Sequence, residues 1–406
     1  MNGPSQTPFN FGDSTPDIRN SAAGYFLGYA NLPTSSLPLR HLCAYEGRRL
    51  AKLIAGYADA DKGGDQVLKY NCTLVDCARL LIDYSASGDH EDLLSQPTAK
   101  LFRLSAFGWE GRAAIGFFRS AWSTDESGVR GKEAWLAFKA ANGVPNHNDL
   151  DGGSFVMEMG GQRWASDLGS DNYQLNGYFT QSLARRYGYY RKSTAGHNTL
   201  TFNNNGVDWG ACDQDPGMSG ITEITLFETS EASTAPSPAY AIVDLTAAYA
   251  KPLNASANRI ERGFAFTEGF QQLLVVDEIA YQDNKSSVVD NVTWTMHTLA
   301  DIHLHGDSAI LSLDSSNLHV RVIEPPTAVF SEAAVRLEPP QYPSDGVSKL
   351  MVMLNVSSSR DTRNDVDVEG QDGLTRIVVG LTMEVDASTP RVRPLAEWKH
   401  HGPFEK

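Results

Sequence analysis

Hydrophobic and polar positions change their spacing once along this chain. Between residues 36 and 82 the apolar residues recur every three or four positions, which predicts amphipathic helices. From about Phe107 onward the chain instead alternates short apolar runs with turns rich in Gly, Pro, Asn and Asp, which is typical of strands. The pattern therefore predicts a short helical segment followed by a mainly β region.

The β-type runs are spaced as in a large antiparallel sandwich. They are Arg112–Trp122, Ala134–Ala140, Ser154–Ala165, Asn198–Phe202, Ile221–Phe227, Tyr240–Leu245, Leu273–Ile279, Asn291–His297, Val320–Ile323, Leu350–Leu354 and Arg376–Val379. The Pro-rich residues 324–347 either separate a smaller C-terminal sheet or form a long surface loop. We expect a helical segment over 1–106, a central β domain over 107–330, and strands over 331–406 that continue or flank the sandwich.

Composition narrows the class of protein. The 406 residues are 41% hydrophobic and 20% charged, which supplies a large core. No apolar stretch approaches the roughly 20 residues of a membrane span. With 34 Lys and Arg against 49 Asp and Glu, the net charge of -15 disfavours a general nucleic-acid binder. The first residues lack a secretory signal, so we expect either an intracellular protein or a chain without its true beginning.

Residues 143–202 concentrate the chemistry-bearing side chains. Asp149, Asp167 and His197 each lie beside a strand-like run, so neighbouring strands can bring them together. Two carboxylates and one imidazole suit a divalent cation such as zinc. Spacing alone leaves open the alternative that the two aspartates are turn residues and the histidine is a hydrogen-bonded strand end.

Proton transfer has two candidates in the same segment. His147 lies in a Pro-Asn-His-Asn-Asp turn, and an exposed histidine changes charge near working pH. Tyr178 lies where a loop meets a strand-like run. The alternatives are a solvated loop histidine and a half-buried aromatic anchor.

A cluster of cationic and aromatic residues follows. It consists of Arg185, Arg186, Tyr187, Tyr189, Tyr190, Arg191 and Lys192. Aromatic faces stack on sugar rings and guanidinium groups bind carboxylate or sulfate, so the cluster suits an anionic sugar. It equally suits the polar face of a twisted strand.

Three runs together resemble one known family. They are His147-Asn-Asp149-Leu-Asp-Gly-Gly-Ser-Phe155, Arg163-Trp164-Ala-Ser-Asp167-Leu-Gly169 and Gly196-His197-Asn198-Thr199-Leu200. In this order they are similar to the central β domain of heparinase II/III-like polysaccharide lyases, a group that includes alginate lyase relatives. The runs Phe9–Ser14 and Phe118–Trp122 also resemble landmarks of that family.

The resemblance implies a fold, a reaction and a set of residues. The fold is an (α/α) toroid followed by antiparallel sheets, and the reaction is β-elimination on an anionic, uronic-acid-containing polysaccharide such as a glycosaminoglycan or alginate. His147 and Tyr178 match residues that take part in catalysis. Asp149, Asp167 and His197 match ligands of a divalent metal, for which zinc is expected. Arg119, Tyr190 and Arg191 are the expected substrate-binding residues.

Two departures from the family pattern qualify these expectations. Asp149 stands where the family has a histidine, which changes the charge and softness of the metal site. The family's toroid is several hundred residues long, so we expect this chain to be a C-terminal portion of such a protein.

The alternative function is a non-catalytic carbohydrate-binding module or a degenerate relative. Members of the family are typically secreted or periplasmic.

Overall fold

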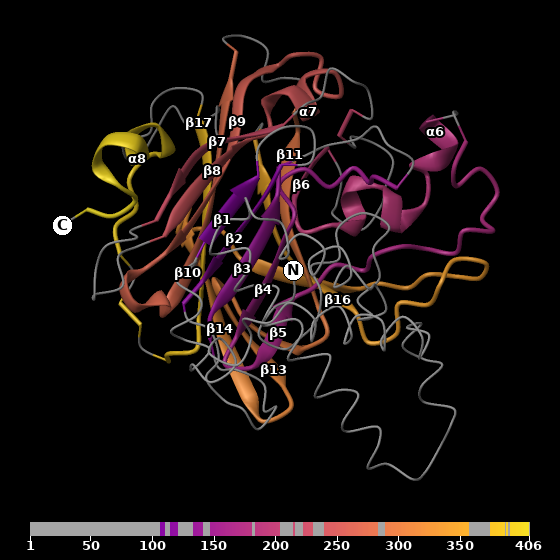
Figure 1. Ribbon diagram of the computed structural model, residues 1–406. Helices are drawn as coiled ribbons and strands as arrows, with labels where there is room; N and C mark the ends of the chain where they lie inside the picture. The colour runs from indigo at the N-terminus through magenta and orange to yellow at the C-terminus, as the bar shows by residue number, and fades with distance from the viewer. Residues whose placement is uncertain are drawn as a thin grey trace, which may run out of the picture.

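The protein is described by a computed structural model in which three antiparallel sheets dominate (Figure 1). The structure describes residues 106–109, 114–120, 133–140, 147–180, 183–203, 214–215, 222–229, 239–282, 289–356, 374–385, 387–388 and 390–405. Apart from its last residue, the predicted helical segment 1–106 lies outside these ranges.

The sheets are ordered as follows. One has five strands in sequence order, β1 (Ala106–Trp109), β2 (Ile115–Arg119), β3 (Trp135–Lys139), β4 (Phe155–Met159) and β5 (Gln162–Ala165). The second has eight, in the order β12 (Asp301–His305), β13 (Ser308–Leu313), β14 (Ser316–Glu324), β17 (Leu374–Thr382), β10 (Gln272–Tyr281), β9 (Ala257–Phe266), β8 (Tyr240–Asp244) and β7 (Glu223–Glu228). The third has β15 (Phe330–Ala334), β16 (Ser348–Asn355), β11 (Asn291–Thr298) and β6 (Leu200–Phe202).

Helical segments in the described ranges are short. They are α6 (Leu183–Arg186), α7 (Thr246–Ala250) and α8 (Leu395–His401), with 3₁₀ turns η2 (Tyr190–Lys192), η3 (Thr194–Gly196) and η4 (Glu268–Phe270). No helix among the described residues is long and apolar enough to cross a membrane.

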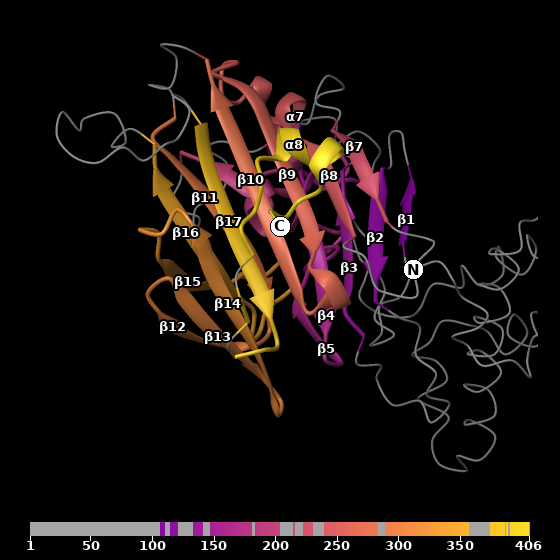
Figure 2. The ribbon, with the colours of Figure 1, turned by 90° about the vertical axis from the view of Figure 1, so that its left-hand side faces the viewer.

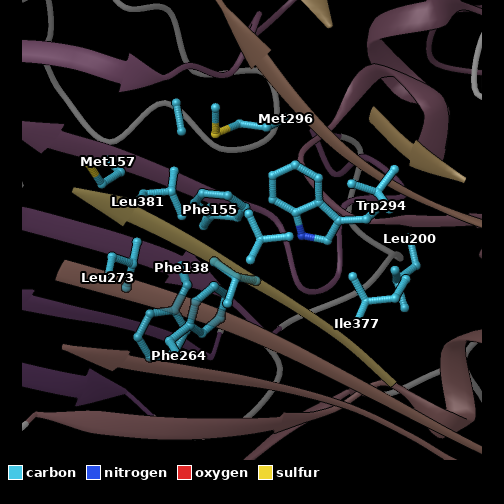
Figure 3. Packing of buried hydrophobic residues seen from close by; sticks show 14 of the residues in the cluster. Phe138, Phe155, Met157, Leu200, Phe264, Leu273, Trp294, Met296, Ile377 and Leu381 are labelled. Atoms are coloured by element: carbon cyan, nitrogen blue, oxygen red, sulfur yellow. The ribbon is translucent and has the colours of Figure 1, made fainter. Parts of the chain in front are cut away.

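One hydrophobic core joins the three sheets (Figure 3). Phe138 and Phe155 from the five-stranded sheet meet Phe264 from β9, with ring centroids 4.8 and 5.7 Å apart respectively. Phe155 also lies 6.4 Å from Trp294 on β11 of the four-stranded sheet. All four side chains have no exposed surface. Each such burial contributes roughly 1.5–3 kcal/mol to stability. Because residues of all three sheets share this core, the sheets pack as one sandwich rather than as separate units. The expected mainly β, antiparallel sandwich is confirmed.

Helix α8 covers the outer face of the eight-stranded sheet (Figure 2). Leu395 and Trp398 are 1% and 0% exposed and pack on Ile242 and Val276. Gly263 permits this contact, because a Cβ there would lie 2.4 Å from Leu395 and 2.7 Å from Trp398.

Two details of the strand prediction are corrected. Ser154–Ala165 is not one strand but the hairpin of β4 and β5, because Gly160 and Gly161 adopt positive φ and turn the chain. Strand β9 was missed because Arg259, Glu261 and Arg262 interrupt its apolar pattern. The sheet accommodates Arg262 in its interior by pairing it with a carboxylate.

The Pro-rich segment contains β15, which pairs with β16. Strand β16 in turn pairs with β11, and β17 pairs with β10. The strands after residue 330 therefore hydrogen-bond directly to strands before it.

Candidate functional site

The predicted site begins at the turn of residues 147–153, which leads into β4. Gly153 has a φ of +79°, and its N–H donates to the carbonyl of Lys139 at 2.7 Å. The side chain of Gln214 brackets Gly152, accepting from its N–H at 2.9 Å and donating to its carbonyl at 2.8 Å. The turn is thus fixed from both sides by described residues.

Behind this turn lies a group of six side chains that we call the buried charged centre. Its members are Lys139, Asp149, Asp151, Asp167, Lys192 and His197, each at most 8% exposed. They form three pairs. Lys192 Nζ lies 2.8 Å from Asp149 Oδ1, Lys139 Nζ lies 2.6 and 2.8 Å from the two oxygens of Asp151, and His197 Nδ1 lies 2.8 Å from Asp167 Oδ2. Removing one partner of such a pair leaves an uncompensated buried charge.

Backbone contacts bring these pairs together. The N–H of Leu150 donates to the carbonyl of Lys192 at 3.0 Å, which ties the turn to η2. His197 directly follows η3, where Gly196 passes so close to η2 that a Cβ would lie 2.2 Å from the carbonyl oxygen of Tyr190. Only glycine fits at this crossing.

The centre contains a set of groups that can hold a cation. Asp149, Asp151 and His197 each offer a ligand atom, and these atoms lie within 4.8 Å of one another. Asp167 engages Nδ1 of His197, while Nε2 is buried and has no hydrogen-bond partner among the described residues. Nε2 is therefore the nitrogen available to a cation, and the set of two carboxylates and one imidazole fits a divalent metal.

This arrangement differs from the predicted ligand set. Asp149 and His197 do meet, but the second carboxylate beside them is Asp151, and Asp167 is placed on the other nitrogen of the ring. A carboxylate in that position fixes the orientation and tautomer of a metal-binding histidine. Asp151, in the same turn as Asp149, was not among the predicted ligands, and a ligand role for Asp167 stays a prediction.

The three carboxylates also set the charge of His197. Burial by itself lowers the pKa of the imidazole, but Asp167, and after it Asp151 and Asp149, raise the pKa to about 9. In the absence of a cation the ring is therefore positively charged at neutral pH.

The opposite side of the turn carries an exposed group of rings that we call the aromatic face, formed by His147, Tyr173 and Phe179. His147 is exposed, and Tyr173 and Phe179 are 43% and 38% exposed. The Phe179 ring lies 5.3 Å from that of His147 and 5.0 Å from that of Tyr173. Tyr173 Oη lies 3.4 Å from His147 Nδ1. Rings presented to solvent in this way suit stacking against a sugar.

Tyr178, the predicted catalytic tyrosine, lies between the aromatic face and the buried charged centre. It is 1% exposed, and its Oη accepts a hydrogen bond from the N–H of Asp171 at 3.1 Å. Lys192 Nζ, which is fully buried, lies 4.5 Å from the centre of the Tyr178 ring. Its catalytic role stays a prediction.

The predicted substrate-binding residues are buried. Arg191 is 8% exposed, and its Nη groups donate to the carbonyls of Leu168, Ser170 and Pro343 at 2.6–3.2 Å. Tyr190 is 2% exposed, its Oη lies 2.7 Å from Nε2 of His297, and burial raises its pKa. Arg119, on β2, is 3% exposed. Roles in substrate binding stay predictions for all three, whereas the observed contacts of Tyr190 and Arg191 join segments of the fold.

Comparison with known proteins agrees with the fold. The family model described as heparinase II/III-like, C-terminal, matches residues 113–365. A solved heparinase III with methylated lysines superposes with a TM-score of 0.55 at 12% identity, over 94% of this chain and 44% of that one. The heparan sulfate lyase HepC from Pedobacter heparinus gives a TM-score of 0.52 at 10% identity, over 97% of this chain and 46% of that one. No curated protein sequence matches significantly.

The antiparallel sandwich superposes on less than half of each of these two solved structures, a heparinase III and a heparan sulfate lyase, which shows a shared fold. Because the family model covers more than half of its residues, this chain belongs to the heparinase II/III-like family, through its C-terminal domain. It spans less than half the length of the solved structures that it resembles.

Proposed function

We propose that this protein binds a uronic-acid-containing polysaccharide and cleaves it by β-elimination, with His147 at the reacting sugar. The observation that carries the proposal is the position of His147, exposed on a turn that the buried charged centre and Gln214 hold in place. Family membership supports this kind of reaction.

β-Elimination makes three demands on the site. The carboxylate of the uronate must be neutralised so that the C5 hydrogen becomes acidic, a base must remove that hydrogen, and an acid must protonate the departing O4. An exposed imidazole meets the first demand through a hydrogen bond to the carboxylate, and it can also relay a proton. A correctly placed acid or base contributes roughly 10²–10⁴-fold to the rate.

We assign the divalent cation, zinc as the first candidate, to Asp149, Asp151 and His197. When bound, it supplies fixed positive charge that stabilises the turn rather than a reacting group. The two lysines pair with the same carboxylates, at 2.6–2.8 Å, so the ammonium groups and a metal compete for them. Whether the lysine ammonium groups or a metal pair with these carboxylates, the turn that carries His147 stays in place.

A second function, carbohydrate binding without turnover, is favoured by one observation. The aromatic face offers exposed rings for a sugar, while the chain spans less than half of the lyase structures that it resembles. Binding by rings requires only this face, whereas elimination also requires a complete cleft. For either function we expect the protein to meet its polymer outside the cytoplasm, in the periplasm or the medium.

The experiment that separates the two functions measures product and binding together. The protein is incubated with alginate, heparan sulfate, chondroitin and hyaluronan, and the absorbance of the unsaturated uronate product is followed in the ultraviolet. Titration calorimetry with the same polymers measures binding, with heat-denatured protein as the control. Product formation supports the lyase, binding without product supports the module, and the absence of both contradicts both.

A further inference from the structure

We propose that Arg262 is a positioning residue, whose guanidinium fixes the turn that carries His147 relative to the segment that carries His197. Arg262 does not act on the substrate itself, because it lies on β9 inside the core and has no exposed surface. Where its effect is measured as enzyme activity, this inference rests on the proposed function. The position of the turn can also be measured without any activity.

Arg262 and Asp277 form a fully buried pair on the inner face of the eight-stranded sheet, where the neighbours of Arg262 along β9 are the core residues Ile260 and Phe264. Arg262 and Asp277 lie directly opposite each other on the paired strands β9 and β10. Nε and Nη2 of Arg262 donate to the two carboxylate oxygens of Asp277 at 2.8 and 2.9 Å. This bidentate contact fixes the plane of the guanidinium, and its Nη1 is left to bond elsewhere.

Nη1 of Arg262 reaches two backbone carbonyls in different parts of the sandwich. It donates to the carbonyl of Gly153 at 2.9 Å and to that of Asn198 at 2.7 Å. Gly153 lies shortly before β4 of the five-stranded sheet, and Asn198 lies shortly before β6 of the four-stranded sheet. One side chain of the eight-stranded sheet therefore joins the segments that lead into the other two sheets.

These two segments carry the candidate site. Gly153 lies two residues after Asp151, in the turn that begins at His147, and Asn198 directly follows His197. A shift of either carbonyl would therefore move Asp151 relative to His197, two of the groups assigned to the cation. Because the turn is short, the same shift would also change the position of His147.

The other contacts between the two segments use neutral hydroxyl groups. The N–H of Asn198 donates to Oγ of Ser154 at 3.1 Å, and Oγ1 of Thr199 donates to the carbonyl of Gly152 at 2.8 Å. A hydroxyl hydrogen can rotate, whereas a guanidinium has a fixed fork of donors and a full charge. Hydrogen bonds from a charged donor are roughly twice as strong as neutral ones. Arg262 therefore sets the geometry at which the two segments meet.

Stability alone does not account for a charged pair at this place. Replacing a buried ion pair by apolar side chains of similar volume is often neutral for stability or even raises it. Apolar side chains could not supply a directed donor to the carbonyls of Gly153 and Asn198. Those two contacts are the ones that concern the site, so a positioning role explains what stability does not.

Arg376 on β17 provides a matched control. Its Nε lies 3.1 Å from Oε1 of Glu278, and its Nη2 donates to the carbonyls of Val392 and Arg393, both at 2.9 Å. Arg376 thus contacts a carboxylate and two backbone carbonyls, as Arg262 does, but its contacts hold the chain that leads into α8. Lysine at either position keeps the charge and loses the fork of donors.

The first measurement is amide hydrogen exchange in the folded full chain. The N–H groups of Leu150 and Gly153 donate to carbonyls at 3.0 and 2.7 Å and report the position of the turn. Arg262→Lys should raise their exchange rates at least about tenfold relative to the amides of β10, which report opening of the core. Arg376→Lys should leave that ratio at its wild-type value. An equal ratio in the two variants overturns the inference.

The second measurement is the kinetics on the polymer that the wild type cleaves best. A displacement of about 1 Å costs on the order of 100-fold in rate, so Arg262→Lys should lower kcat by roughly 10–100-fold and leave KM within about threefold of the wild type. Arg376→Lys should keep kcat while it loses a comparable amount of thermal stability. Wild-type kcat in folded Arg262→Lys, or an equal loss of kcat in the control, overturns the inference.

A second variant covers the case in which Arg262→Lys does not fold. Arg262→Met combined with Asp277→Leu removes both charges together, a change that buried pairs often tolerate, and it should show the same rise in exchange and the same fall in kcat. If neither Arg262 variant folds while Arg376→Lys does, Arg262 is a requirement for folding and the inference is overturned. If the wild type cleaves none of the polymers, the proposed function fails, and the exchange ratio alone decides this inference.

Discussion

The two sides of the turn at residues 147–151 differ in nearly every physical respect. His147 is exposed and contacts Tyr173 and Phe179, which are also exposed. Asp149 and Asp151, two and four residues further on, have no exposed surface and pair with lysines. A short turn thus links a solvent-facing aromatic face to a buried charged centre.

Charged residues near a candidate catalytic group therefore need not react with substrate. Buried pairs are costly to break, so they hold a backbone in one conformation. Exposed rings contribute little to stability and are available to a ligand. We therefore expect substitutions in the buried charged centre to change stability and substitutions on the aromatic face to change binding or activity.

The largest effect on stability is expected from Lys192→Met. This change leaves the carboxylate of Asp149 buried without its ammonium partner at 2.8 Å, so the free energy of unfolding should fall by roughly 3–5 kcal/mol. Chemical denaturation measures it. Lys251→Met is the matched control, because Lys251 is 80% exposed, lies 3.5 Å from Asp215 and should change stability by less than about 1 kcal/mol. Equal effects of the two substitutions would show that the centre is not a stabilising element.

Binding of a divalent cation should produce the next largest effect on the free energy of unfolding. Zinc at a hundred times its Kd should raise the free energy of unfolding by about 2.7 kcal/mol. Asp151→Asn should abolish binding, and Asp167→Asn should weaken it by roughly 10–100-fold, because Asp167 acts through His197. Calorimetric titration of both variants tests the assignment. Unchanged affinity in Asp151→Asn would instead favour the ligand set expected from the sequence.

The pH dependence of stability should report the second buried histidine, His297. Burial, and then the charges of Lys349 and His197, hold its pKa well below the ordinary value. The unfolded state therefore binds a proton more readily, so stability is complete above about pH 6.5 and falls as the pH decreases below it, by up to ~1.4 kcal/mol per pH unit. His297→Gln should remove this component from the measured slope. His305→Gln, at an exposed position, is the control substitution.

The smallest effect on stability is expected from Phe179→Ala on the aromatic face. Phe179 is 38% exposed, so we expect a change in unfolding free energy within about 0.5 kcal/mol. Affinity for the polysaccharide should nevertheless fall by on the order of 1 kcal/mol, the size of one ring contact. Val329→Ala, at a 58% exposed position, should alter neither quantity. Unaltered polymer affinity in Phe179→Ala would remove this ring from the binding surface.

Much of the fold could be predicted from the sequence because continuous apolar runs mark buried strands. The expected runs at residues 134–140, 273–279 and 291–297 coincide with β3, β10 and β11. Strand β9 could not be recognised in this way, because Arg262 lies in its middle. In the structure Arg262 pairs with Asp277 at 2.8 and 2.9 Å and donates to the carbonyls of Gly153 and Asn198. A local pattern does not show that a distant carboxylate will compensate a buried charge.

The candidate site was predictable in its location but not in its partners. Spacing indicated that Asp149 and His197 could meet, and the structure places both in the buried charged centre. Residue spacing could not indicate which ring nitrogen of His197 is contacted by Asp167. The many Arg and Tyr residues near residue 190 likewise did not show whether their side chains are exposed. In the structure Arg191 donates to backbone carbonyls inside the protein. Such partners depend on the meeting of segments far apart in the chain.

We expect His147 to act on the substrate while the buried charged centre holds the turn that carries it. The most direct test measures two quantities on His147→Ala, the rate of unsaturated uronate formation and the free energy of unfolding. We predict a rate at least about 100-fold below that of the wild type and an unfolding free energy within about 0.5 kcal/mol of it. A variant that forms product at the wild-type rate, or that loses activity only because it no longer folds, would contradict this role of His147.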